Sequence, residues 1–291
     1  MAGRDGPSLA ELDRVLAGRS ARVDQRLTSN QPGHWERAVR ANHGEGQNST
    51  NGEKSSMKVV RKSLLSGAQS AEGIVVVIDV LRAFTCSALM FHYGIEELVL
   101  VKTPQEALEM RAKDPRYLVA GEVKGIKVDG FDLGNSPKDI VELGEPFFRG
   151  RKVVLRSSAG TQGVLAASAT AQEVILGNYL TASAIAKYLR AKDSGDLLVT
   201  VLAMGFQAEQ KSVEDEVCGD YIEHLLTGRP YDHLAAIWTY LTHPYVATRL
   251  RGEVSFVPRE DVVLAIQRDL FSFVLVGKPA CPHVVVRRID V

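Results

Sequence analysis

From residue 57 onward, short apolar runs alternate with amphipathic segments that begin at helix-capping residues. Residues 73–79 are a continuous apolar run that ends in Asp79, which is typical of a strand buried on both faces. The alternation predicts an α/β fold, with a mainly parallel sheet flanked by helices and a more helical C-terminal part. Further strands are expected at residues 97–101, 117–120, 152–156, 173–176, 197–202, 273–276 and 283–287, and helices at 83–93, 181–189, 216–226, 233–241 and 260–269.

Two further helix starts carry a capping residue followed by proline, whose fixed φ suits the first helical position. They are Thr103–Pro104 and Ser136–Pro137. The segment Ser157–Gly163 joins a strand to another helix through small residues, and the backbone amides of such a turn suit an oxyanion. It lacks the ending of a P-loop and the GxGxxG spacing, so neither nucleotide nor dinucleotide binding is supported.

The first 56 residues differ from the rest, because they are rich in Arg, Asn, Gly, Ser and Gln and sparse in apolar residues. We expect residues 1–56 to be a disordered N-terminal extension, with a short helix around 8–16 capped by Ser8. Met57 could be the natural start, and a regulatory or docking tail is the alternative. Residues 57–291 are expected to form the folded unit, which is long enough for two α/β subdomains.

The composition narrows the classes of partner. Lys and Arg total 35, as do Asp and Glu, so no excess of positive charge favours nucleic acid. No apolar run reaches the length of a membrane span, and the N-terminus lacks the apolar segment of a secretory signal. The widely spaced Cys86, Cys218 and Cys281 suit reduced thiols in a cytoplasmic protein, the first two as core residues. A homo-oligomer is compatible with these properties.

A glycine-rich loop with mixed charges occupies residues 121–137. Its glycines allow sharp turns and close approach of the backbone to a ligand. Glu122, directly after a predicted strand, is the best candidate for a Mg²⁺ ligand, because Mg²⁺ takes one or two carboxylates together with water and substrate phosphate. Asp129 and Asp132 are as readily explained as turn residues that bond their own backbone.

The end of this loop and two other segments supply further polar groups. Asn135 and Ser136 offer free backbone N–H groups at a helix N-terminus, which suits an anion, although ordinary capping explains them too. Asp79 at its strand end could hold a metal, with Arg82 gripping an anionic oxygen, or could simply cap a helix. The acids Glu214–Glu216 could supply metal ligands or be favourable charges in the first turn of a helix.

Four of these segments together resemble one family. They are Val77–Ala83 (VIDVLRA), Gly121–Glu122, Gly130–Pro137 (GFDLGNSP) and Glu214–Asp215. In this order and spacing they resemble the 2-phosphosulfolactate phosphatases, from about Met57 to the C-terminus. The resemblance implies a Mg²⁺-dependent enzyme of the coenzyme M pathway. Its substrate would be a phosphate monoester flanked by a carboxylate and a sulfonate.

The resemblance also implies a site. It places Asp79, Arg82 and Glu122 in one pocket and raises Glu214 and Asp215 to site residues. The expected catalytic residues are Asp79, Arg82, Glu122 and Asp215, the expected Mg²⁺ ligands are Asp79, Glu122, Glu214 and Asp215, and the expected substrate-binding residues are Lys127, Asn135, Ser136, Ser158, Gly160, Thr161 and Thr181. Whether a metal-bound water or an Asp attacks phosphorus stays open.

Two positions depart from the pattern of the family. Ala159 and Thr181 stand where the family usually carries Asn, so two amide side chains are missing from loops that we expect to face the ligand. Their loss should alter recognition of the substrate while leaving metal and phosphate binding intact. The alternatives are therefore a phosphatase for a different phosphorylated hydroxy acid and a non-catalytic binder of small organic anions.

Overall fold

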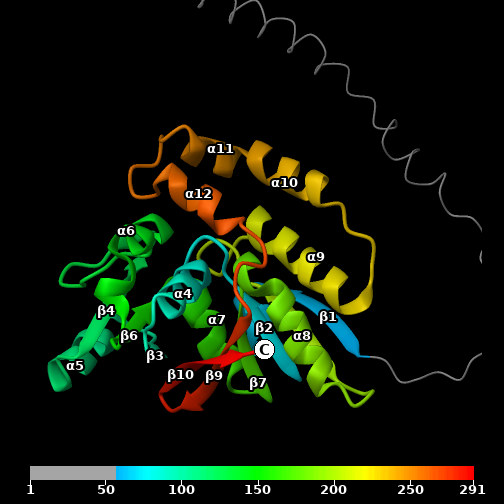
Figure 1. Cartoon of the computed structure of the whole chain (residues 1–291), viewed down its shortest axis with the longest axis horizontal. Helices are drawn as coiled ribbons and strands as arrows, with labels where there is room; N and C mark the ends of the chain where they lie inside the picture. The colour runs from blue at the N-terminus through cyan, green and yellow to red at the C-terminus, as the bar shows by residue number, and fades with distance from the viewer. Residues whose placement is uncertain (1–56) are drawn as a thin grey trace, which may run out of the picture. The chain divides into compact units, whose positions relative to one another are not determined.

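The computed structural model describes residues 57–291, which form strands and helices in alternation (Figure 1). The predictions for residues 1–56 lie outside the described residues. The strands are β1 (Lys58–Ser63), β2 (Ile74–Ile78), β3 (Glu97–Leu100), β4 (Tyr117–Val123), β5 (Ile126–Lys127), β6 (Lys152–Arg156), β7 (Glu173–Gly177), β8 (Leu198–Ala203), β9 (Phe273–Ala280) and β10 (His283–Asp290). The helices are α3 (Leu64–Gln69), α4 (Ala83–His92), α5 (Pro104–Lys113), α6 (Pro137–Phe148), α7 (Gly160–Ala167), the 3₁₀ helix η1 (Tyr179–Thr181), α8 (Ala182–Lys192), α9 (Val213–Thr227), α10 (His233–Thr242), α11 (Pro244–Leu250) and α12 (Arg259–Ala265).

All ten strands belong to one mixed sheet, in the order β1-β8-β2-β7-β9-β10-β3-β6-β4-β5. The predicted α/β class with a mainly parallel sheet is confirmed. Helices cover both faces, because the side chains of β2 alternate between two hydrophobic cores. Val75 and Val77 pack in the core that includes α4 and α7, whereas Val76 and Ile78 pack in the core that includes α8 and α9.

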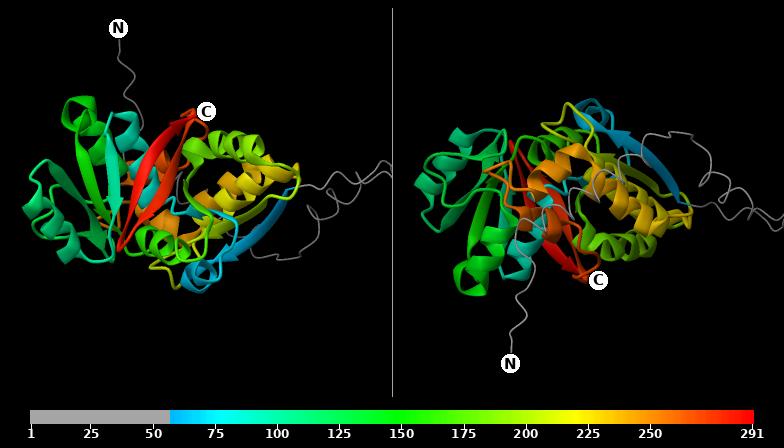
Figure 2. Two further views of the ribbon diagram at one scale, coloured as in Figure 1. Left: turned by 90° about the horizontal axis from the view of Figure 1, so that it is seen from below. Right: turned by 90° about the horizontal axis from the view of Figure 1, so that it is seen from above.

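The sheet consists of two parallel halves that run in opposite directions. One half is β1-β8-β2-β7 and the other is β3-β6-β4. Between them lies the β9–β10 hairpin, which pairs antiparallel with β7 on one side and with β3 on the other (Figure 2). In a flat sheet the carboxyl ends of the two halves would lie at opposite edges. In this sheet the carboxyl ends of the two halves meet, because Gly160 N, after β6, donates a hydrogen bond of 2.8 Å to Asp79 Oδ2, after β2. The sheet therefore twists strongly across the hairpin.

The helix starts that carry proline form as predicted. Thr103 caps α5 by accepting a hydrogen bond from Glu106 N, and the Glu106 side chain accepts one from Thr103 N in return. Ser136 caps α6 and accepts a hydrogen bond from Asp139 N. Both helices therefore begin where the local signal places them.

Several elements differ from the sequence predictions, among them β9, which continues to Ala280, and α12, which ends at Ala265. Neither α3 nor α11 was anticipated, and the start of α11 at Pro244 carries the same proline signal as α5 and α6. Helix α9 begins at Val213 rather than Glu216, which places Glu214 and Asp215 in its first turn.

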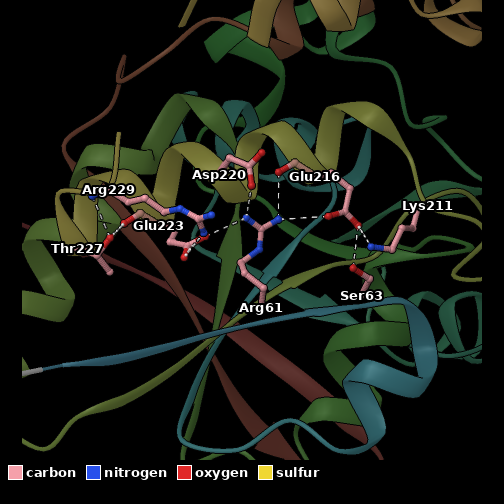
Figure 3. Close-up of polar contacts among 8 residues, drawn as sticks. All are labelled: Arg61, Ser63, Lys211, Glu216, Asp220, Glu223, Thr227 and Arg229. Carbon is pink, nitrogen blue, oxygen red and sulfur yellow. Dashed lines mark hydrogen bonds and ion pairs between the residues drawn. The ribbon is translucent and has the colours of Figure 1, made fainter. Parts of the chain in front are cut away.

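Ion pairs fasten α9 to the edge strand β1 (Figure 3). Arg61 Nη1 donates to Asp220 Oδ1 at 2.7 Å, and Arg61 Nη2 donates to the carbonyl oxygen of Glu216 at 3.1 Å. The carboxylate of Glu216 also accepts a hydrogen bond from Ser63 Oγ at 2.7 Å and pairs with Lys211 at 3.2 Å. These contacts fix the position of α9 along the sheet, and with it the position of the acids in its first turn.

The C-terminal helices α10, α11 and α12 lie across the carboxyl end of β2 (Figure 1), where Tyr240, Val246 and Val262 form a small core with Leu81 and Val213. None of the helices formed by residues 57–291 is long and apolar enough to cross a membrane. The predicted core thiols, at positions 86 and 218, are buried as expected.

Gly121 permits the close pairing of β4 with β6. Its φ of +135° is in the range that favours glycine, and a Cβ there would lie 1.9 Å from the carbonyl oxygen of Arg156. Gly130, in the same loop, has a φ of +82°, but a Cβ there would meet only Leu108 Cδ2, at 3.8 Å. The two glycines thus share a backbone requirement and differ in available space.

Gly121→Ala should lower the free energy of unfolding by about 3 kcal/mol or more, because it combines backbone strain with a clash against a strand. The matched variant Gly130→Ala should lower it by about 1 kcal/mol, the strain alone. Urea unfolding curves measure both effects. Equal losses in the two variants would contradict the close approach of β4 and β6.

Candidate active site

A cavity with a volume of about 50 Å³ lies where the carboxyl ends of the two half-sheets meet. Its wall brings together six of the predicted site residues and adds side chains from the loop between β8 and α9, from α11 and from the loop between α11 and α12. The predicted residues that line it are Asp79, Arg82, Glu122, Asn135, Ser158 and Glu214, and the additional ones include Phe206, Gln207, Tyr245, Arg249 and Phe256.

Asp79 connects the two halves of the sheet. It directly follows β2 and is only 5% exposed. Its Oδ1 accepts a hydrogen bond from Ala83 N, the first residue of α4, at 3.1 Å, and its Oδ2 accepts one from Gly160 N, the first residue of α7. The carboxylate therefore lies at two helix N-termini, whose partial positive charge stabilises it. Gly160 is required for this contact, because a Cβ there would lie 2.5 Å from Asp79 Oδ2.

Glu122 is held by the same turn from the other side. It lies near the end of β4 and is 5% exposed. Its Oε1 accepts a hydrogen bond from Ser158 N at 2.5 Å, and its Oε2 accepts one from Ser158 Oγ at 3.0 Å and another from Gly125 N. Arg156 Nη1 donates to the carbonyl oxygen of Glu122 at 2.6 Å, which fixes the backbone as well.

These contacts correct the expectation for the turn after β6. We expected its amides to bind the anionic groups of the substrate, but Ser158 N and Gly160 N bind the carboxylates of Glu122 and Asp79. Thr161 is fully buried and exchanges hydrogen bonds with Ser157, so its hydroxyl does not reach the cavity. The sequence of this turn alone could not show that acids at the ends of two other strands accept hydrogen bonds from its amides.

The two acids at the start of α9 have different surroundings. Glu214 lines the cavity, is 2% exposed, and its Oε2 has no hydrogen-bond partner. Asp215 lies behind the cavity wall, where its Oδ1 accepts a hydrogen bond from Val80 N at 2.7 Å and its Oδ2 accepts one from Gly205 N at 2.8 Å. Asp215 therefore braces the loops after β2 and β8, and the structure does not place it among the residues facing the cavity.

The carboxylates repel one another inside the fold. Burial raises the pKa of Asp79 to about 6, and the charge of Glu122 adds to this rise. Burial also raises the pKa of Glu214 to about 7, with Asp79 adding to the rise and Arg249 opposing it. Burial together with Asp79 and Glu214 raises the pKa of Asp215 well above its usual range. The cluster holds more negative charge than its neighbours balance, which favours a bound proton or cation.

Arg82 is tied to residues of the cavity wall. Its Nη1 donates to Asp261 Oδ2 at 3.1 Å and to the carbonyl oxygen of Phe256 at 2.9 Å, and its Nη2 donates to the carbonyl oxygen of Gly125 at 2.9 Å. Asp261 is fully buried and also accepts a hydrogen bond from Ser136 Oγ at 2.8 Å. The ion pair of Arg82 and Asp261 joins α12 to the starts of α4 and α6. Arg82 therefore holds parts of the cavity wall together, and this uses donors that could otherwise bind a ligand.

The remaining predicted residues do not line the cavity. Lys127 is exposed, and its Nζ donates to the carbonyl oxygen of Asp132 at 3.1 Å. Together with Ser136 it borders a second hollow beside the cavity, which Arg82 and Asn135 also line. Thr181 is fully buried and bonds to Asn178, so the structure does not place its side chain at the ligand as we expected.

A comparison with known families shows which family this chain belongs to. The family model described as 2-phosphosulpholactate phosphatase matches residues 59–278. The chain belongs to the 2-phosphosulpholactate (2-phosphosulfolactate) phosphatase family. The match covers all of β2, β4, β6 and α9, the elements that carry the acids of the site.

Several relatives in this family are named probable 2-phosphosulfolactate phosphatase. The relative from Deinococcus radiodurans is 38% identical over 126 residues, covering 43% of this chain and 51% of the relative. That from Carboxydothermus hydrogenoformans is 38% identical over 152 residues, covering 52% and 60%. That from Bacillus subtilis is 28% identical over 153 residues, covering 53% and 64%. Each alignment thus spans less than two thirds of the relative's length.

Sequence reasoning missed several residues of the site of this family member, and three of them carry or orient its charges. Asp261 resembled an ordinary acid in the first turn of a helix. Arg249 and Tyr245 belong to α11, a helix that we did not anticipate, although Pro244 at its first position was a usable signal. Ala159, which replaces the usual Asn of the family, does line the cavity, and it lies at the N-cap of α7.

Glu214→Gln should stabilise the metal-free protein at pH 8. The pKa of Glu214 is raised in the folded state, so its contribution to stability is present below its unfolded pKa and is lost as pH rises through about 7. Removing the charge should therefore raise the free energy of unfolding at pH 8 by about 1–3 kcal/mol and change it little at pH 4. Thermal unfolding in EDTA at both pH values measures the difference.

Glu216→Gln, two residues further along α9, is the matched control. Glu216 pairs with Arg61 and Lys211 at the surface of the sheet edge, so its removal should lower stability slightly at pH 8. A loss of stability in Glu214→Gln equal to that in Glu216→Gln would contradict the repulsion within the carboxylate cluster.

Proposed function

We propose that the protein is a Mg²⁺-dependent phosphatase that hydrolyses the phosphate monoester of a small anionic hydroxy acid. The observation that carries the proposal is the meeting of three buried carboxylates, Asp79, Glu122 and Glu214, with the guanidinium groups of Arg82 and Arg249 around one cavity. Acids that hold a divalent cation beside cations that hold an oxyanion are the arrangement that phosphoryl transfer requires.

The residues present fit Mg²⁺. The cavity presents hard oxygen donors, and Glu214 Oε2 and Asn135 Oδ1 are buried without a hydrogen-bond partner. Across residues 57–291, no three His, Cys, Asp or Glu side chains are grouped to enclose a metal ion by themselves. This suits Mg²⁺, which usually keeps several waters and takes one or two carboxylates plus substrate phosphate. Asp79 and Glu214 are the proposed ligands, with Glu122 beside them.

When bound, Mg²⁺ would polarise the phosphoryl group and stabilise charge on the leaving oxygen. The chain's own residues keep the site ready for this. Hydrogen bonds from Ala83 and Gly160 hold the Asp79 carboxylate in one orientation, and those from Ser158 and Gly125 do the same for Glu122. Fixed carboxylates need little reorganisation during the reaction, which is the main advantage of a preorganised polar site.

Family membership supports 2-phosphosulfolactate as the substrate. This ester carries a carboxylate and a sulfonate beside its phosphate, and among the cavity arginines Arg249 provides positive charge that Asp261 does not balance. The methyl group of Ala159 in place of the family's usual amide favours a second candidate, a different phosphorylated hydroxy acid that needs fewer polar contacts. The alignments with the named relatives cover too little of their length to choose between the two.

A panel of phosphate monoesters, including 2-phosphosulfolactate, phospholactate and phosphoglycolate, tests the proposal. Phosphate release should require added Mg²⁺, stop on addition of EDTA and recover on restoring the ion. Release from 2-phosphosulfolactate with the highest kcat/KM would identify the substrate, and a higher value for another ester would favour the second candidate. Binding of these anions in a calorimeter without release of phosphate from any ester would refute the enzyme and indicate a binder.

Asp79→Asn should lower kcat/KM by about 100-fold or more, because the amide loses the charge of a metal ligand and directs an NH₂ group at a backbone N–H. Asp129→Asn, an exposed acid in the glycine-rich loop, is the matched control and should leave activity unchanged. Initial rates of phosphate release at saturating Mg²⁺ measure both variants. Full activity in Asp79→Asn with the wild-type dependence on Mg²⁺ would rule out this residue as a ligand.

A further inference from the structure

Arg249 is a buried cation that has no anionic partner within residues 57–291. It lies near the end of α11 and is 7% exposed. Its Nη1 donates to the carbonyl oxygen of Tyr245 at 2.7 Å, and its Cζ lies 3.2 Å from the centroid of the Tyr245 ring. It forms no ion pair with any acid among residues 57–291. Because arginine keeps its proton even when buried, an unbalanced positive charge remains inside the protein.

Arg82, the other arginine of the cavity, provides the contrast. It is equally buried at 7% exposure, but its charge is balanced by Asp261, and two carbonyl oxygens accept further hydrogen bonds from it. Only Arg249 of the two has both its charge and most of its donors uncommitted. The difference separates an arginine that organises the wall from one that is available to a ligand.

Glu214, a group of opposite charge, lines the same cavity as Arg249. Glu214 Oε2 is buried without a hydrogen-bond partner, and Arg249 lowers the pKa that burial raises on this carboxyl. A buried cation and a buried anion that feel each other's charge but form no ion pair leave room for a group between them. A cation at the carboxylates and an oxyanion at the arginine would satisfy both.

We infer that Arg249 binds the phosphoryl oxygens of the substrate, and that Tyr245 is the positioning residue that orients the guanidinium. This inference rests on the proposed function and assigns the phosphoryl group to one of the two arginines of the cavity. The hydrogen bond to Tyr245 uses one of the guanidinium donors, which leaves the planar fork of the others for bidentate contact with an oxyanion. Stacking on the ring of Tyr245 fixes the plane of this fork.

The test measures binding of inorganic phosphate to the full chain by calorimetry in the presence of Mg²⁺. Arg249→Met should weaken phosphate binding by at least about 10-fold, since charge-assisted hydrogen bonds are lost. Arg249→Lys should restore part of the affinity, because it keeps the charge but not the fork. Arg251→Met is the matched control, an exposed arginine paired with Glu253 two residues away, and it should bind phosphate like the wild type.

Thermal stability separates binding from a structural role. Arg249→Met removes a buried charge that forms no ion pair within residues 57–291, but it also removes the charge that lowers the pKa of Glu214. Its Tm in the absence of ligand is therefore compared at pH 4, where Glu214 is protonated, and should equal or exceed that of the wild type. A lower Tm with unchanged phosphate affinity would overturn the inference and make Arg249 a structural residue. Lactate and methanesulfonate serve as additional probes. Loss of lactate or methanesulfonate binding in Arg249→Met, with phosphate binding intact, would likewise overturn the assignment to the phosphoryl group.

Failure of the inference is distinguishable from failure of the proposed function. If the wild type hydrolyses an ester with Mg²⁺ and Arg249→Met retains the wild-type KM, kcat and phosphate affinity, the function stands and the inference falls. If no ester is hydrolysed but phosphate binds in a manner that depends on Arg249, the function falls and the inference stands.

Discussion

The site depends on one turn that binds two carboxylates. Between β6 and α7, the amide of Ser158 donates to Glu122 and the amide of Gly160 donates to Asp79. Glu122 belongs to the same half of the sheet as the turn, whereas Asp79 follows β2 in the other half, so the hydrogen bond from Gly160 joins halves whose strands run in opposite directions. The twist of the β9–β10 hairpin allows the meeting, and the absence of a Cβ at Gly160 allows the close approach.

Concentrating acids in this way lowers the stability of the protein without a ligand. Helix N-termini and backbone amides offset part of the repulsion at Asp79 and Asp215, whereas Glu214 has an oxygen with no partner at all. Asp261 balances Arg82, and no acid of the described chain balances Arg249. Glu214 and Arg249, whose charges no ion pair within residues 57–291 balances, both line the cavity. Unbalanced charges are expected at such a place when they serve function at a cost in stability.

Local signals in the sequence predicted the elements well but not the partners of the polar groups. The apolar run before Asp79 and the capping residues at Thr103 and Ser136 each act within a few residues, and the corresponding strand and helices formed as predicted. The resemblance to a family predicted that Asp79 and Glu122 line one cavity. Hydrophobic periodicity could not predict this, because it does not indicate which strands lie side by side. The turn after β6 was assigned to the substrate for the same reason, since its true acceptors lie 36 and 81 residues away along the chain.

The glycine-rich loop of residues 121–137 mainly positions other residues of the site. Asp132 accepts a hydrogen bond from Val119 N and pairs with Arg111, so it shapes the loop, as turn chemistry suggested. The loop places Glu122 and Asn135 in the cavity wall. The guanidinium with free hydrogen-bond donors, that of Arg249, belongs to α11, a helix that the sequence analysis did not predict. The carboxylates are fixed by backbone amides and leave little room for variation. Under the proposed function, selection among anionic substrates would fall to the side chains that α11 and the turn at Ala159 present.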